Sequence, residues 1–101
     1  MVLKDKYRQH LETIFSSVEI PIEVWAHGSR VDGTAHEGSD LDLVVRTKNL
    51  EQLPMDVLLA IKEKIKESNI PIVVEVFDWS RLPEYFQKNI IAKHIVLFSN
   101  M

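Results

Sequence analysis

Apolar and polar residues alternate along the chain with two different periods, which predict helices and strands. The first apolar set recurs at intervals of three and four residues and consists of Leu3, Tyr7, Leu11, Ile14 and Phe15. That spacing predicts a helix that buries one side. After Pro21 the period changes to two, since residues 22–27 read IEVWAH. This alternation predicts a strand that ends at Gly28, with Trp25 and His27 on the same face.

The middle of the chain continues this succession of helices and strands. Residues 29–35 predict a short helix or turn, and residues 41–45, LDLVV, predict a strand inside a sheet. Pro54 suits the start of a helix whose buried stripe consists of Val57, Leu58, Ile61 and Ile65. A third strand is expected at residues 72–77, IVVEVF.

The last part of the chain predicts one more helix and one more strand. Pro83 opens a helix with Tyr85, Phe86 and Ile90 on its inner side, and residues 94–98, HIVLF, predict a final short strand. The resulting order is typical of an α/β (α+β) fold in which helices pack on one face of a small mixed sheet. We expect the other face of the sheet to be left for chemistry.

Length, composition and charge restrict the class of protein. With 101 residues, 46% of them hydrophobic, the chain is expected to form a single domain over residues 1–101. The absence of cysteine excludes disulfides and thiolate metal sites. A net charge of -3 gives no general attraction for nucleic acid or for an anionic membrane. No segment has the character of a signal peptide or a membrane span, so we expect a soluble cytoplasmic protein.

Two aspartates at the start of the second strand are the first candidates for chemistry. Residues two apart on a strand project to the same side, so Asp40 and Asp42 point together while Leu41 and Leu43 point toward the helices. Two carboxylates this close repel each other unless a cation or solvent neutralises them. An Asp-x-Asp motif alone is more often a solvated strand edge, so the metal interpretation needs further support.

A third acid supplies that support. Glu75 lies within the otherwise apolar third strand, on the opposite side from Val74 and Val76. A carboxylate on a buried strand requires a partner, and a neighbouring strand that carries Asp40 and Asp42 would provide one with a shared cation. Asp78 is the competing acid. Alternation places it on the apolar side, where it is better suited to capping the following turn.

The Gly-Ser turn after the first strand predicts an anion site. Gly28 lets the backbone approach an anion without a Cβ in the way, and Ser29 offers a hydroxyl and an amide at a helix start. Arg30 adds a charged donor, although an ordinary surface ion pair is the alternative. A Gly-Ser pair is weak evidence by itself. The pair becomes stronger evidence for an anion site because it precedes Asp40 and Asp42 in the sequence.

The stretch GSRVDGTAHEGSDLDLVV, followed by VEVFDW, resembles the nucleotidyltransferase superfamily that includes DNA polymerase beta. It is most similar to the minimal nucleotidyltransferases, which are single short domains. The resemblance implies that Gly28, Ser29, Arg30 and Ser39 bind the nucleotide. It also implies that Asp40, Asp42 and Glu75 are the catalytic residues and hold Mg²⁺. Glu75 is a departure, because minimal members usually carry aspartate at that position.

This resemblance implies a reaction and a partner. Two Mg²⁺ ions would neutralise the triphosphate of ATP, a hydroxyl would attack the α-phosphorus, and Glu75 would ligate an ion or accept the proton. Minimal nucleotidyltransferases resemble antitoxins whose partner is an all-helical HEPN protein. We therefore expect transfer of AMP to a hydroxyl of such a partner, in a homo- or hetero-oligomer. The alternatives are a non-catalytic nucleotide-binding module that acts on a HEPN protein by contact, and transfer to a small molecule.

Other conspicuous residues are expected to be structural. The four histidines have no metal-ligand spacing and are interpreted as surface or packing residues. Trp25 and Trp79 are expected in the core or at an interface rather than stacked on a base. Lys62, Lys64 and Lys66 alternate with acids on one helix, which indicates a solvated face and no direct nucleic-acid binding.

Overall fold

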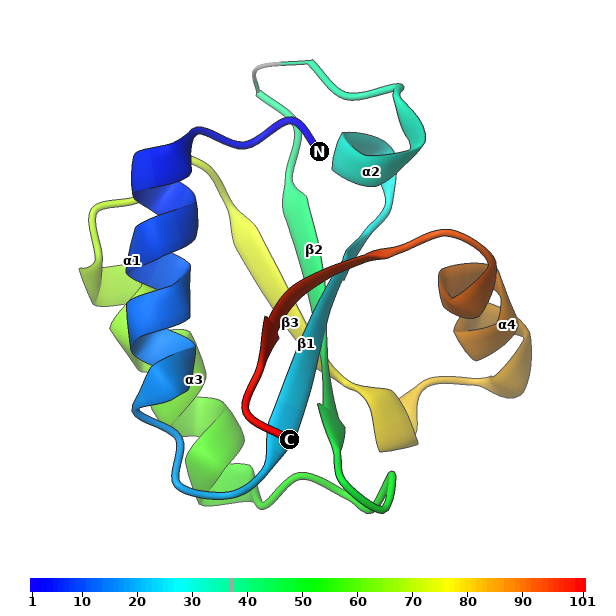
Figure 1. Cartoon of the computed structure of the whole chain (residues 1–101). Helices are drawn as coiled ribbons and strands as arrows, with labels where there is room; N and C mark the ends of the chain where they lie inside the picture. The colour runs from blue at the N-terminus through cyan, green and yellow to red at the C-terminus, as the bar shows by residue number, and fades with distance from the viewer. Residues whose placement is uncertain (37) are drawn as a thin grey trace.

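The computed structural model describes residues 1–36 and 38–101. Glu37, to which the sequence assigned no role, lies outside the described residues. The elements follow the predicted order and have these bounds: α1 Asp5–Ser16, β1 Ile22–His27, α2 Ser29–Asp32, β2 Leu41–Thr47, α3 Met55–Glu67, β3 Val74–Asp78, the 3-10 turn η1 Trp79–Arg81, α4 Glu84–Ala92 and β4 Ile95–Ser99 (Figure 1). In the described part of the chain, no helix is long and apolar enough to cross a membrane.

The four strands form one mixed sheet with the order β3-β2-β1-β4. β1 pairs antiparallel with both β2 and β4, whereas β2 and β3 run parallel. A parallel pair needs a long crossover connection, and α3 supplies it between β2 and β3. The expected α/β fold with a small mixed sheet is therefore confirmed.

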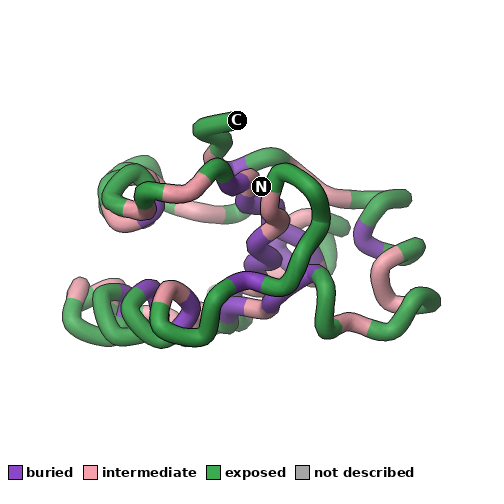
Figure 2. Tube along the Cα trace, turned by 90° about the horizontal axis from the view of Figure 1, so that it is seen from below, coloured by how far each residue is buried: buried purple, intermediate pink, exposed green. Residues whose placement is uncertain are grey.

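One face of the sheet carries the main core. α1 and α3 lie side by side over this face (Figure 1). Alternate residues of β1 and β2 point into it, and the fully buried members are Ile22, Val24, Ala26, Leu41, Leu43 and Val45. From the helices, Leu11 and Phe15 of α1 and Ile61 of α3 join them. Figure 2 shows the buried positions gathered in the middle of the molecule, with the outer turns of the helices exposed.

The opposite face carries a second, smaller cluster. Trp25 of β1 and Val44 of β2 pack here against Trp79 of η1 and Ile90 of α4. α4 and η1 thus cover part of the face that the sequence left for chemistry (Figure 1). The prediction that Tyr85 lies on the inner side of α4 was wrong, because its side chain is 70% exposed. The helix docks through Phe86 and Ile90, four residues apart, which turns Tyr85 about 100° away.

Two prolines mark where the helices begin. Pro54 and Pro83 each precede the first helical residue and have extended backbone, with ψ of 136° and 149°. Each helix therefore starts one residue later than predicted. A proline suits this position because its missing N–H is not needed there.

Candidate active site

Three polar residues form a row across the sheet on the face opposite α1 and α3. His27 of β1 pairs with Asp42 of β2, and Asp42 pairs with Glu75 of β3. Side chains of paired residues point to the same face of a sheet. Asp40 lies two positions before Asp42, immediately ahead of β2. The candidate acids are therefore gathered at the end of the sheet where β1 runs into Gly28.

The charges of these acids act on one another. Asp42 is half-buried, and burial raises the pKa of its carboxyl group; the charges of Glu75 and Asp40 raise it further. The two acids predicted as partners of Asp42 are thus close enough to oppose its ionisation. A group of carboxylate oxygens that repel one another is the donor set that a hard divalent cation such as Mg²⁺ prefers. The residue types at this site, three carboxylic acids, suit such an ion.

The acids are neighbours, but their side chains are not arranged as a complete set of metal ligands. Among residues 1–36 and 38–101, no three His, Cys, Asp or Glu side chains are grouped closely enough to hold a metal ion. Asp40 and Glu75 are both exposed, so their side chains are free to separate under mutual repulsion. The expectation that Glu75 sits on a buried strand was wrong. β3 is an edge strand of the sheet, a position that the sequence of one strand does not reveal.

Gly28 fits against Asp42 in a way that no other residue can. Its φ is +81°, in the region that residues with a side chain rarely adopt. A Cβ at this position would lie 2.6 Å from the Oδ2 atom of Asp42. The carboxylate thus occupies the space that the missing side chain leaves. Ser29, the first residue of α2, follows directly and is half-buried.

Arg30 is the buried residue of α2, in the connection between β1 and β2. It is 5% exposed, so the surface position assumed in the alternative interpretation was wrong. Its Nε atom donates to the carbonyl of Ser39 at 2.9 Å, and its Nη1 atom donates to the carbonyl of Val2 at 2.5 Å. Arg30 therefore positions the segment that leads into Asp40. Its predicted contact with the nucleotide stays a prediction.

Ser39 belongs to the same loop framework. The His36 N–H donates to Ser39 Oγ at 3.0 Å, and the Ser39 N–H donates to the His36 carbonyl at 3.0 Å. Together with the bond from Arg30 to the Ser39 carbonyl, these contacts fix the backbone immediately before Asp40. Direct binding of a nucleotide by Ser39 stays a prediction as well.

His27 is a site residue whose importance the sequence did not reveal. It is 5% exposed, and burial lowers the pKa of its imidazole. Its ring lies 6.1 Å from that of Phe77 and 6.0 Å from that of Phe86, measured between centroids. Its Nε2 atom is buried and has no hydrogen-bond partner among residues 1–36 and 38–101. The alternation of β1 placed His27 on the correct face, but only the pairing of β1 with β2 places it beside Asp42.

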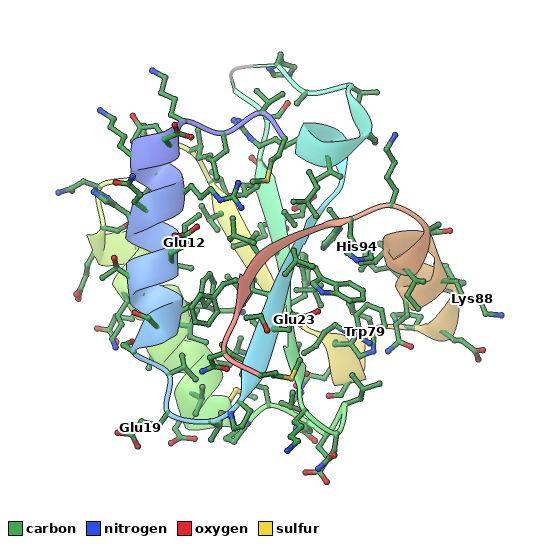
Figure 3. All side chains as sticks on the ribbon, in the orientation of Figure 1. Glu12, Glu19, Glu23, Trp79, Lys88 and His94 are labelled. Atoms are coloured by element: carbon green, nitrogen blue, oxygen red, sulfur yellow. The ribbon has the colours of Figure 1, made fainter. Side chains whose placement is uncertain are left out.

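Next to this row, the sheet face is filled by stacked rings. The Trp25 ring stacks on His94 at 3.7 Å and lies edge-on to Trp79 at 5.5 Å. The Arg46 guanidinium lies 3.9 Å and 4.5 Å from the centroids of Trp25 and Trp79. Figure 3 shows Trp79 and His94 between the sheet and α4. Both tryptophans are buried, which confirms the packing interpretation.

A glycine-serine turn pressed against paired acids on a mixed sheet defines a class of enzymes. The turn suits phosphate groups, and the acids suit the divalent cations that accompany them. Enzymes that transfer nucleotides from nucleoside triphosphates combine these two features.

Sequence comparison identifies the family. The profile of the family described as Polymerase beta, Nucleotidyltransferase matches residues 9–101. The chain is also 35% identical over 89 residues to the probable protein adenylyltransferase MntA of Haemophilus influenzae, an alignment that covers 86% of this chain and 75% of that protein. The chain belongs to the polymerase beta nucleotidyltransferase family, and the resemblance of its motif to that family is confirmed.

Solved structures confirm the fold. A toxin-antitoxin crystallised with AMP-PNP superposes with a TM-score of 0.72 at 15% identity, covering 93% of this chain and 74% of that one. A mutant of the toxin-antitoxin MntA-HpeT gives a TM-score of 0.70 at 14% identity over 98% of this chain and 76% of that one. A structure from Shewanella oneidensis gives 0.69 at 11% identity over 97% and 74%.

Proposed function

We propose that this nucleotidyltransferase transfers AMP from Mg-ATP to a hydroxyl group of a partner protein and is the antitoxin of a toxin-antitoxin pair. The observation that carries the proposal is the position of Asp42, which lies against Gly28 and within the electrostatic reach of Glu75 and Asp40. The relative in Haemophilus influenzae is named as a protein adenylyltransferase, and two of the similar structures are toxin-antitoxins. These names support the choice of a protein acceptor.

In this proposal the phosphates of ATP lie along the turn at Gly28 and Ser29. The Ser29 hydroxyl and amide donate to the phosphate oxygens, and the missing Cβ of Gly28 leaves room for the Asp42 carboxylate beside them. Asp40, Asp42 and Glu75 would hold two Mg²⁺ ions, which would neutralise the charge of the triphosphate. Arg30 and Ser39 act through the loop, because their bonds fix the backbone that carries Asp40.

Glu75 is placed to serve the acceptor. It is exposed on the edge strand β3, so a hydroxyl of a second protein can reach its carboxylate. The hydroxyl oxygen forms a bond to the α-phosphorus, the bond from that phosphorus to the bridging oxygen breaks, and pyrophosphate leaves. Glu75 accepts the proton of the hydroxyl. Its extra methylene, compared with the usual aspartate, lengthens its reach toward solvent.

We further propose that the acceptor is an all-helical HEPN protein and that residues 1–101 act as a single minimal domain within the complex. The test is incubation of the chain with Mg-ATP labelled at the α-phosphate and with the product of the neighbouring gene. Wild type and Glu63→Gln, which removes an exposed acid of α3, are expected to label the partner equally. Asp42→Asn is expected to lose at least about a hundredfold in rate. Absence of label under conditions where the two proteins bind would overturn the proposal.

A second candidate function is neutralisation of the partner by contact alone. It is favoured by Glu75, which replaces the usual aspartate and is exposed rather than enclosed. Replacement of both Asp40 and Asp42 by alanine separates the two functions. A contact module keeps its effect on the partner in this double variant, whereas a transferase loses it.

A further inference from the structure

β3 leaves one side of its backbone unpaired. It is an edge strand, because the sheet order β3-β2-β1-β4 gives it β2 as its one neighbour in the described part of the chain. The N–H of Leu41 donates to the carbonyl of Val73 at 2.9 Å. Since successive residues of a strand bond to opposite sides, Glu75 also bonds toward β2, whereas Val74 and Val76 direct their N–H and carbonyl groups to the open edge. The outer side of β3 can therefore accept another strand.

The two edges of the sheet are not equally open. At the other edge, the pairing of β4 with β1 shifts register between Val24 and Trp25, and a bulge of this kind discourages further pairing. β3 pairs with β2 in unbroken register over its five residues, and it contains no proline or lysine, which are common protectors of an edge. β3 is therefore the edge that is better suited to an added strand.

A groove of 370 Å³ runs along this edge. It is lined by four consecutive residues of β3 and one of α3, namely Val74, Glu75, Val76, Phe77 and Lys62. Four residues of a strand extend about 13 Å, so the groove suits a short extended segment. Val74 and Val76 point to the α3 side, where Lys62 lies, and Glu75 points to the face of the candidate active site.

An added strand would extend the row of polar residues across the sheet. The row runs from His27 through Asp42 to Glu75. Because Glu75 directs its own N–H and carbonyl toward β2, an antiparallel strand would meet it in a non-hydrogen-bonded pair, in which side chains lie closest. The facing Cβ atoms would be about 4.5–5.5 Å apart. A hydroxyl on the facing residue would thus lie beside the carboxylate that accepts its proton in the proposed function.

The occupant of this edge has to supply a hydroxyl, and a second copy of the chain does not supply one through the same strand. Residues 72–78 read IVVEVFD, without serine, threonine or tyrosine. Two copies of β3 paired about Glu75 would also place two carboxylates opposite each other, which is destabilising. The exposed Lys62 favours an acidic side chain on the α3 side of the incoming strand. The groove is therefore complementary to a segment of a different protein.

We propose that β3 binds an extended segment of the acceptor protein as an added antiparallel strand, with a serine, threonine or tyrosine facing Glu75 and an acidic neighbour facing Lys62. The inference rests on the proposed function, because it states how the acceptor of the same reaction is held. Backbone hydrogen bonds at Val74 and Val76 align the hydroxyl with the acids. Strand addition of this kind is a recurrent mode of peptide recognition.

A proline at position 74 tests the backbone contact. Proline is tolerated as the first residue of an edge strand whose N–H faces outward, so Val74→Pro removes one outward donor and keeps the ladder to β2. The assay measures transfer of label from Mg-ATP to the product of the neighbouring gene at varied partner concentration. We expect Val74→Pro to raise the KM for the partner about tenfold, as loss of a hydrogen bond does, and to leave the affinity for Mg-AMP-PNP unchanged. The control Met55→Pro, at the exposed first residue of α3, should change neither.

Amide hydrogen exchange of wild type tests the same contact without a variant. With Mg-AMP-PNP bound and the partner at about ten times its Kd, the amides of Val74 and Val76 should exchange about tenfold more slowly, because only the free protein exposes them. The amides of Asp5 and Lys6 are the control. They lie at the start of α1, where no intrahelical acceptor exists, and should keep their rates.

The remaining outcomes separate the inference from the proposed function. Transfer of label with unchanged exchange at Val74 and Val76, or with an unchanged KM in Val74→Pro, overturns the inference and leaves the proposed function intact. Protection of both amides that rises with the concentration of the chain alone assigns the edge to a second copy and also overturns it. Protection by the partner without transfer of label supports the docking and removes the transfer reaction. If thermal unfolding shows that Val74→Pro does not fold, the exchange measurement decides.

Discussion

His27 and Asp42 face each other across β1 and β2, and each is held in surroundings that disfavour its charged form. Burial lowers the pKa of His27 and raises that of Asp42, to which the charges of Glu75 and Asp40 also contribute. The buried Nε2 atom of His27 has no hydrogen-bond partner in the part of the chain that the structure describes. Side chains with perturbed pKa values and unsatisfied groups tend to lie in functional sites. Both features are typical of a functional site, and they mark this pair as part of the candidate active site.

His27→Phe is expected to stabilise the protein. Phenylalanine keeps the ring contacts with Phe77 and Phe86 but removes the buried Nε2 atom, which has no partner among the described residues. The expected gain in the free energy of unfolding is about 1 kcal/mol. For a chain of this length it corresponds to a rise in melting temperature of roughly 4–8 °C. Thermal and urea unfolding measure it.

The gain should also depend on pH. The folded state holds the pKa of His27 below the unfolded value, so the unfolded state binds a proton more readily. Wild type therefore loses stability as pH falls below about 6.5, and the advantage of His27→Phe grows. His10→Gln, at an exposed histidine, should keep the wild-type dependence. An advantage that stays constant between about pH 7.5 and pH 5.5 would contradict the assignment.

The site residues differ in how far the sequence reveals them. Asp40 and Asp42 follow from a spacing of two on a strand, and Gly28 follows from its place at the end of β1. The place of His27 in the site cannot be derived from the sequence pattern, because its neighbour Asp42 is set by the register between β1 and β2. The buried position of Arg30 depends in the same way on contacts with Val2, 28 residues away, and Ser39, nine residues away.

At the scale of elements, one aspartate joins three segments. Asp78, at the end of β3, accepts hydrogen bonds from the N–H and the hydroxyl of Ser80, at 3.0 Å and 2.9 Å, which starts η1. The prediction that it caps this turn is confirmed. Its other oxygen accepts from the buried N–H of Leu53 at 2.9 Å, just before α3. Asp78 thus ties the entry of α3 to the exit of β3.

Asp78→Ala is expected to destabilise the protein by about 2–3 kcal/mol, because the Leu53 N–H is left buried without an acceptor. The matched control is Arg81→Gln. Arg81 contacts the same carboxylate at 3.6 Å, but its side chain is 49% exposed, so its loss should cost less than about 1 kcal/mol. Urea unfolding compares the two. Similar losses in both variants would show that the ion pair, and not the buried bond, is the stabilising contact.

Element boundaries were predictable where a local signal exists. The alternation over residues 22–27 gives the bounds of β1, and prolines give the starts of α3 and α4 to within one residue. The edge position of β3 has no local signal, so the burial of Glu75 was predicted wrongly. The inner position predicted for Tyr85 was wrong for a related reason. The short helix α4 docks through one row of residues, Phe86 and Ile90, and Tyr85 lies outside that row.

At the scale of the whole molecule, the two faces of the sheet carry different parts of the protein, the main core on one and the candidate active site on the other. One face holds the main core beneath α1 and α3, and the other holds the acid row beside the ring cluster of Trp25 and Trp79. The core keeps β1, β2 and β3 in register, and the register keeps Asp42 next to Glu75 despite their repulsion. A bound cation would turn that repulsion into attraction.

The most direct test of this account is thermal unfolding of wild type and Asp42→Asn with and without Mg-AMP-PNP. Because the folded state raises the pKa of Asp42, its ionised form destabilises the fold above the unfolded pKa, and the neutral variant should melt higher without ligand. Wild type should gain about 2.7 kcal/mol from ligand at a hundred times its Kd. Asp42→Asn should lose most of that gain, whereas Glu63→Gln should behave as wild type. An Asp42→Asn variant that melts lower without ligand, or that keeps the full ligand response, would contradict the account.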